Sequence, residues 1–262
     1  MERVPPPRLF FSQFTLSLNR WRAQGGLVLL YGSQAVLTYA LRAIASLLAA
    51  GQHVVFIDSA NAFNPFLIAE VAARLNRPPE ELLDRIHISR TFTVHQLEAL
   101  ITERIAEALK TYASRILVAS GFLDNLYDED VELREAWRIF RKAAAHLRAL
   151  ADAGSLVLVV CPDPAARGEP SRTMRLPDRD GLLHALMAAA DKVIKLEASA
   201  LYLEKSVRAT DAPACALYLS ASRTRQAGAD RFHRSRALAR GAPRRGSAGK
   251  DLGETRQCPD GP

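Results

Sequence analysis

The sequence predicts an α/β domain whose mostly parallel β-sheet is covered by helices on both faces. Short, continuous apolar runs alternate along the chain with longer segments in which apolar residues recur at helical spacing. Continuous apolar runs are typical of strands buried on both faces, and such strands belong to parallel sheets. With 262 residues and 48% hydrophobic content, the chain is long enough to bury one substantial core.

Two kinds of strand are expected. The buried strands of the parallel sheet are Leu27–Tyr31, His53–Asp58, Ile86–Arg90, Arg115–Ser120 and Ser155–Cys161. The later segments Asp191–Glu197, Ala200–Lys205 and Cys215–Ser220 alternate more strongly between apolar and polar residues. Alternation is typical of strands with one solvated face, so we expect these segments to form an antiparallel edge at the C-terminal end of the sheet.

Helices are expected between the strands, where start and stop signals mark their ends. Gly51 and Gly154 are natural helix C-caps, and Pro79 suits the first turn of a short helix. The predicted helices are the segment that ends before Gly51, Asn64–Asn76, Pro79–Asp84, Thr93–Tyr112, Glu132–Asp152 and Gly181–Ala190.

Three regions are expected along the chain: an N-terminal arm (residues 1–24), a core domain (residues 25–220) and a basic tail (residues 221–262). From Ser222 onward the chain has ten Lys and Arg against four Asp and Glu, so the tail carries six of the seven net positive charges. The tail has almost no large apolar residues, which predicts disorder. The alternative is that the tail is an aberrant reading-frame end without a function.

Composition argues against several classes of protein. No apolar run reaches the roughly 18 residues of a membrane span, and the N-terminus lacks the apolar core of a signal peptide. The three cysteines, Cys161, Cys215 and Cys258, show neither metal-ligand nor CxxC spacing. We therefore expect a cytoplasmic protein with reduced thiols, no membrane contact and no metal site.

The segment of residues 26–50 has the strand–glycine–loop–helix layout of a phosphate-binding P-loop. When the pattern G-x-x-x-x-G-K-[ST] starts at Gly32, Leu37 replaces the second glycine, Thr38 the lysine and Tyr39 the metal-binding hydroxyl. The glycine lets the backbone approach phosphate, and the lysine supplies charge to the outer phosphates. The sequence therefore predicts a vestigial phosphate loop, formed by Gly32, Ser33, Gln34, Ala35 and Thr38.

Several stretches resemble the RecA/RadA family of strand-exchange recombinases, over about residues 26–205 and in family order: GLVLLYG, HVVFIDSANAFNP, LLDRIHISRTFTVHQLEALI and ADKVIKLE. The resemblance implies a RecA-like P-loop NTPase fold. It also implies a catalytic glutamate two residues after Asp58, a metal-binding aspartate at the end of the fourth strand and a polar sensor after the fifth. Those positions hold Ala60, Ala119 and Cys161-Pro162, with Asp124 further along as a weaker substitute. No catalytic residue is expected.

The resemblance further implies two DNA-contacting loops. The first corresponds to Tyr127–Glu132, which is acidic and should repel phosphates. The second corresponds to Pro162–Asp180, where the candidate DNA-binding residues are Arg167, Arg172, Arg175 and Arg179. Four acidic residues lie in the same segment, so a solvated loop of mixed charge is an equally good interpretation.

Two hypotheses of function follow. In the first, the protein is a non-hydrolysing RecA/RadA-like accessory in DNA recombination or repair. It contacts a recombinase or a repair polymerase, binds DNA weakly through its tail, and has no cofactor apart from ATP bound without hydrolysis. In the second, it is a divergent ATP-binding, DNA-dependent ATPase and a recombinase in its own right. A regulatory RecA-fold protein unconnected with DNA is a more remote alternative.

Overall fold

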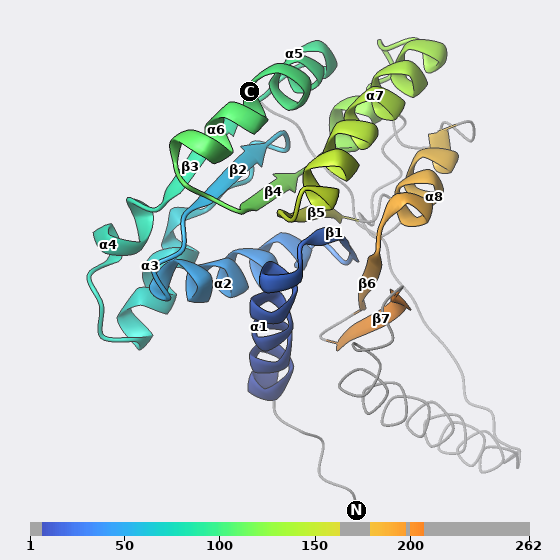
Figure 1. Ribbon diagram of the computed structural model, residues 1–262. Coiled ribbons are helices and arrows are strands. Elements are labelled where there is room, and N and C mark those ends of the chain that lie inside the picture. Colours follow the sequence, from blue (N-terminus) through green and yellow to red (C-terminus); the bar gives the residue numbers. More distant parts are fainter. Residues whose placement is uncertain (1–6, 163–178, 198–199, 207–262) are drawn as a thin grey trace, which may run out of the picture. The chain divides into compact units, whose positions relative to one another are not determined.

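The structure, a computed structural model, describes residues 7–162, 179–197 and 200–206 (Figure 1). These residues form a seven-stranded sheet in the order β3-β2-β4-β5-β1-β6-β7. The strands are β1 (Gly26–Gly32), β2 (Val54–Asp58), β3 (Ile86–Arg90), β4 (Ile116–Ser120), β5 (Leu156–Pro162), β6 (Lys192–Glu197) and β7 (Ala200–Ser206). Every neighbouring pair is parallel except β6 with β7. The predicted fold class, a mostly parallel sheet with an antiparallel C-terminal edge, is confirmed.

Strand β6 corrects one part of that prediction, because it pairs in parallel with β1 and only β7 runs antiparallel. The reason is burial on both faces: Val193 packs into one core cluster, while Ile194 and Leu196 pack into the other. A strand covered on both sides can continue a parallel sheet through a helical crossover. The predicted strand Cys215–Ser220 and the tail lie outside the described residues.

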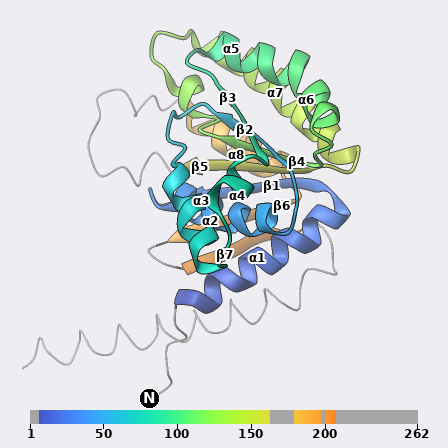
Figure 2. The ribbon, with the colours of Figure 1, turned by 90° about the vertical axis from the view of Figure 1, so that its left-hand side faces the viewer.

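Helices cover the sheet in two layers, visible in Figure 1 and, after a quarter turn, in Figure 2. One face carries α5 (Val94–Ala99), α6 (Ile105–Thr111), α7 (Leu133–Asp152) and α8 (Asp180–Ala189). The other face carries α1 (Pro7–Gln24), α2 (Val36–Ala49), α3 (Pro65–Arg74) and α4 (Pro79–Leu83). The two core clusters divide the strands by side-chain alternation: Leu29 and Tyr31 face the first layer, and Val28 and Leu30 face the second.

The N-terminal arm is a helix whose apolar side is part of the core. Phe14, Leu18 and Trp21 of α1 are buried in the same cluster as α2. The ammonium of Lys192, itself buried at the start of β6, lies 5.4 Å from the centre of the Trp21 ring. Among the described residues, no helix combines the length and hydropathy that crossing a bilayer requires.

The predicted helix Thr93–Tyr112 is interrupted by a π-helical turn, Leu100–Arg104, between α5 and α6. The Thr93 side chain caps α5 by accepting a hydrogen bond from Gln96 N. Leu97, Ile101 and Ile105 follow one another at intervals of four residues, and all three are buried. The wider turn brings each of them to the sheet, where a regular helix with 3.6 residues per turn would drift away.

Candidate functional site

The candidate site lies at the carboxyl ends of the parallel strands. Ligands of open α/β sheets bind at this edge, and the strand order brings the ends of β1, β5 and β4 together. Three segments lie at this edge: the turn after β1, the end of β2 with Ser59 and Ala60, and the end of β4 with Gly121. The fold therefore gathers the predicted phosphate loop and the expected catalytic positions along one edge.

The turn after β1 is short and bound to β6. The Ser33 amide donates to the Leu196 carbonyl oxygen at 2.9 Å, and the Val36 amide donates to Ser33 O at 2.9 Å, where α2 begins. Gly32 has φ +128°, and a Cβ there would collide with the Leu196 carbonyl oxygen, so only glycine fits. The turn consists of residues 33–35, and part of its backbone is engaged with β6.

The predicted loop residues occupy different environments. Gly32 is buried, Gln34 is exposed, and Ser33, Ala35 and Thr38 are half-buried. The Ser33 hydroxyl is buried and has no hydrogen-bond partner within the described part of the chain. The neighbouring side chains Leu37 and Tyr39 pack against the core cluster formed by α2 and the sheet.

Asp58 has a structural task that the sequence did not predict. Its side chain is fully buried, and its two carboxylate oxygens accept hydrogen bonds from the amides of Ala62 (3.0 Å) and Phe63 (3.1 Å). Asn61 adopts φ +49°, which turns these successive amides toward the carboxylate. Arg90 Nε lies 3.6 Å from one of the same oxygens. Asp58 therefore acts as the anion that orders the loop after β2.

Ala60 packs directly against the backbone that follows β4. A Cβ on Gly121, which has φ +68°, would lie 2.6 Å from the Ala60 Cβ. Hydrogen bonds from Ser59 N to Ser120 O and from Gly121 N to Val160 O, both 3.0 Å, fix this arrangement. Ala119 is fully buried inside β4. Ala60 and Ala119 carry methyl groups and offer no ligand for a metal ion.

Arg179 is the only one of the four predicted DNA-binding arginines within the described residues, because Arg167, Arg172 and Arg175 lie outside them. It is 3% exposed, and its guanidinium donates to the carbonyl oxygens of Leu126, Asp128 and Val131. The N–H groups of Arg179 that could donate to a DNA phosphate are therefore already hydrogen-bonded to backbone carbonyl oxygens. In this structure Arg179 holds the acidic segment Tyr127–Glu132 in place.

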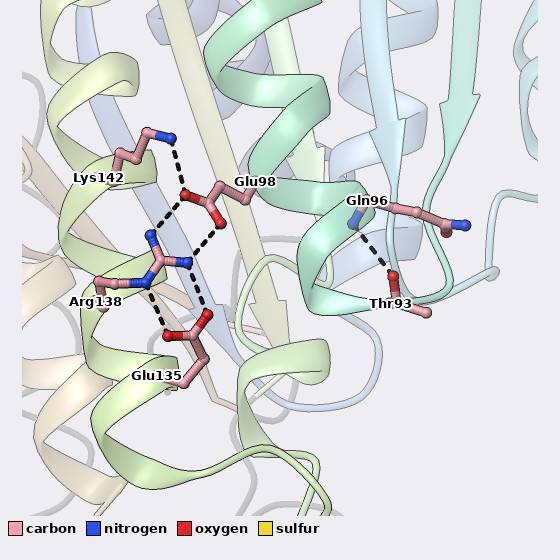
Figure 3. A network of polar contacts seen from close by, with 6 residues as sticks. All are labelled: Thr93, Gln96, Glu98, Glu135, Arg138 and Lys142. Atoms are coloured by element: carbon pink, nitrogen blue, oxygen red, sulfur yellow. Dashed lines mark hydrogen bonds and ion pairs between the residues drawn. The ribbon is translucent and has the colours of Figure 1, made fainter.

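A charged network joins α5 to α7 on the outer side of one helical layer (Figure 3). Glu98 is 9% exposed, and its carboxylate accepts two hydrogen bonds from Arg138, at 2.9 and 3.0 Å, and one from Lys142 at 2.9 Å. Arg138 also donates to Glu135. The hydrogen bonds from Arg138 lower the pKa of Glu98 to about 2. No sequence motif indicated this network, because its partners lie about 40 positions apart.

A histidine pair lies at the opposite end of the strands, where β2 and β3 begin. His53 Nδ1 and His87 Nε2 are 3.1 Å apart, and the Tyr112 ring stacks on His87 with 3.5 Å between ring centres. The planes of the His53 and His87 rings are nearly parallel, and one of the two facing nitrogens donates a hydrogen bond to the other. Burial, and then the charge of His53, lower the pKa of His87.

Comparison with protein families agrees with the topology and with the order of the segments. A family model described as Rad51 matches residues 36–197. The match begins with α2, immediately after the turn that follows β1, and ends with β6. It covers more than half of the 262 residues. The chain belongs to the Rad51 family of RecA-like recombinases.

Proposed function

We propose that this Rad51-family protein is a non-hydrolysing accessory that acts through protein contacts. Membership of the family indicates a role in DNA recombination or repair. The observation that carries the finer proposal is the contact of Ala60 with Gly121, at the position where the family resemblance implies a catalytic glutamate. The nearest carboxylate along the chain, that of Asp58, is already engaged by two backbone amides.

The size of the expected defect supports the proposal. Phosphoryl transfer depends on positioned cations, bound Mg²⁺ and an oriented water. Removing one preorganised electrostatic group typically costs on the order of 2.7–4 kcal/mol in the barrier, although such losses are not additive. Thr38 supplies no cation, Tyr39 and Ala119 supply no metal ligand, and Ala60 cannot orient a water. Even two of these losses would suppress turnover by several orders of magnitude.

The other parts of the proposal concern partners and location. A recombinase or a repair polymerase is the proposed protein partner, and the proposed site of action is the cytoplasm. DNA binding is proposed to be weak and to come mainly from residues 221–262, because Asp128, Glu129 and Asp130 at the first family DNA loop are exposed and acidic. We propose residues 25–220 as the core domain and residues 1–24 as an arm attached to it.

Phosphate release by the purified full chain, with Mg²⁺ and single-stranded DNA, tests the proposal. Turnover should stay at the background of a protein-free control, and Thr38→Ala should not change it. Nucleotide binding is measured separately by equilibrium dialysis, since binding without turnover agrees with the proposal. Turnover well above background that Thr38→Ala abolishes would overturn it in favour of a divergent DNA-dependent ATPase.

A further inference from the structure

A shallow hollow of about 300 Å³ lies at the beginning of α7. It is lined by Glu132, Arg134, Glu135, Arg138 and Arg141. Helix α7 is basic: from Leu133 to Asp152 it carries five Lys and Arg against two Asp and Glu, a net charge of +3. By contrast, residues 1–221 together carry a net charge of only +1. Positive charge is therefore concentrated on this helix.

Part of this charge is neutralised within the protein. Arg138 donates from Nε and Nη2 to Glu135 and from Nη1 and Nη2 to Glu98, so four of its five N–H groups are engaged (Figure 3). Lys142 pairs with Glu98 at 2.9 Å. Two carboxylates and two cations thus cancel, and Glu135 and Arg138 form a neutral part of the lining, so the remaining charges of the hollow are those of Arg134, Arg141 and Glu132.

Arg134 and Arg141 remain without an ion-pair partner among the residues that the structure describes, and both are exposed. They lie seven residues apart on α7, two helical turns or about 10 Å along the axis. Arg141 Nε donates to the Trp137 carbonyl oxygen at 3.2 Å, which fixes the base of its side chain. Its two Nη groups remain available, and their planar arrangement allows them to bind both oxygens of one carboxylate.

We propose that this hollow is a docking surface for an acidic segment of a protein partner, whose carboxylates pair with Arg134 and Arg141. The proposal rests on the accessory role above and specifies the chemistry of the partner. The neighbouring charges favour a protein segment over nucleic acid. Asp128, Glu129 and Asp130 are exposed just before α7, and Arg179 holds their segment in place. A continuous polyanion that extended along the helix would meet these carboxylates, whereas a peptide can place its acidic residues at the arginines alone.

The test uses the full chain labelled with 5-fluorotryptophan, since it has only two tryptophans, Trp137 on α7 between Arg134 and Arg141 and Trp21 in α1. A short peptide with two glutamates separated by two glycines, which places its carboxylates about 10 Å apart when extended, is titrated in at low salt while the two ¹⁹F resonances are followed. The Trp137 resonance should shift saturably and the Trp21 resonance should not, which would locate the binding at α7 and not at α1. Arg134→Ala combined with Arg141→Ala should weaken this binding about fivefold, as expected for two exposed ion pairs.

Three comparisons make the result decisive. Arg104→Ala with Lys110→Ala removes two exposed cations from the neighbouring helical segment and should leave the Trp137 titration unchanged. Arg141→Lys keeps the charge but removes the fork, and should weaken binding. An oligo-dT of six phosphates should shift Trp137 less than the peptide does.

Three results would each overturn the proposal: normal binding by the double-alanine variant, full binding by Arg141→Lys, or a stronger response to oligo-dT than to the peptide. Phosphate release reports on the accessory role independently of these titrations.

Discussion

Replacing Glu98 with glutamine should destabilise the protein measurably. Glutamine keeps the size and one oxygen acceptor of the side chain, but it removes the charge that Arg138 and Lys142 surround. The glutamate is 9% exposed in its position on α5, and both of its partners come from α7. The substitution therefore tests how strongly this network holds the two helices together.

The lowered pKa of Glu98 gives the scale of the effect. It falls from 4.5 to about 2, mainly because of the hydrogen bonds from Arg138. At about 1.4 kcal/mol per pKa unit this shift corresponds to about 3 kcal/mol. The Arg138 and Lys142 side chains are 49% and 48% exposed, so solvent screens the interaction. We expect Glu98→Gln to lower the free energy of unfolding at pH 7 by about 1–2 kcal/mol.

Urea unfolding of both proteins as a function of pH is the measurement. A carboxylate with a depressed pKa stabilises the native state above its unfolded-state pKa and loses this effect as the pH falls through the folded-state value. The difference between wild type and Glu98→Gln should thus be full above pH 4.5 and shrink toward pH 2. Glu135→Gln is the control and should have a smaller effect. No difference at pH 7, or a difference independent of pH, would refute the reasoning.

Three further predictions concern other parts of the chain. Gly32→Ala should destabilise the protein by about 3 kcal/mol in urea unfolding, because of its positive φ and the collision with Leu196 O; a neutral result would contradict the described turn. Since the pKa of His87 is lowered from 6.5, its neutral form stabilises the native state above that pH, and stability should fall on acidification. His87→Phe should flatten the dependence between pH 7 and pH 5 in the same assay, and an unchanged slope would show that His87 does not cause it. Deleting residues 222–262 should remove most of the DNA affinity that fluorescence anisotropy measures at low salt. If the truncated chain binds DNA as tightly as the full chain, the acidic segment Tyr127–Glu132 does not prevent DNA binding by the core.

The strands were predictable because a strand buried on both faces appears in the sequence as a continuous run of apolar residues. Ile86–Arg90 has the predicted bounds, and Leu156–Pro162 is offset from its prediction by a single residue. The helix beginning at Leu133 likewise starts within one residue of the expected position. A π turn contains one residue more than an α-helical turn, and the spacing of apolar residues in a sequence does not show this difference. The π-helical turn at Leu100–Arg104 could therefore not be predicted.

The candidate site was predictable in its location but not in its contacts. The glycine after an apolar run indicated the turn at Gly32, but the carbonyl of Leu196 that closes it lies more than 160 positions away. The local sequence after β2 does not show that the Asp58 carboxylate accepts hydrogen bonds from the amides of Ala62 and Phe63. The burial of Arg179 was missed for a similar reason, since a polar, arginine-containing segment indicates solvent exposure in most proteins.

The π-helical turn marks where this fold can change its length. A π turn holds one residue more than a regular helical turn between the same two ends. Deleting one residue within Leu100–Arg104 would therefore restore a regular helix while leaving Glu98 beside α7 and Leu109 against the sheet. Insertions and deletions among related sequences should gather at this turn, and the strands on either side of it should keep a constant length.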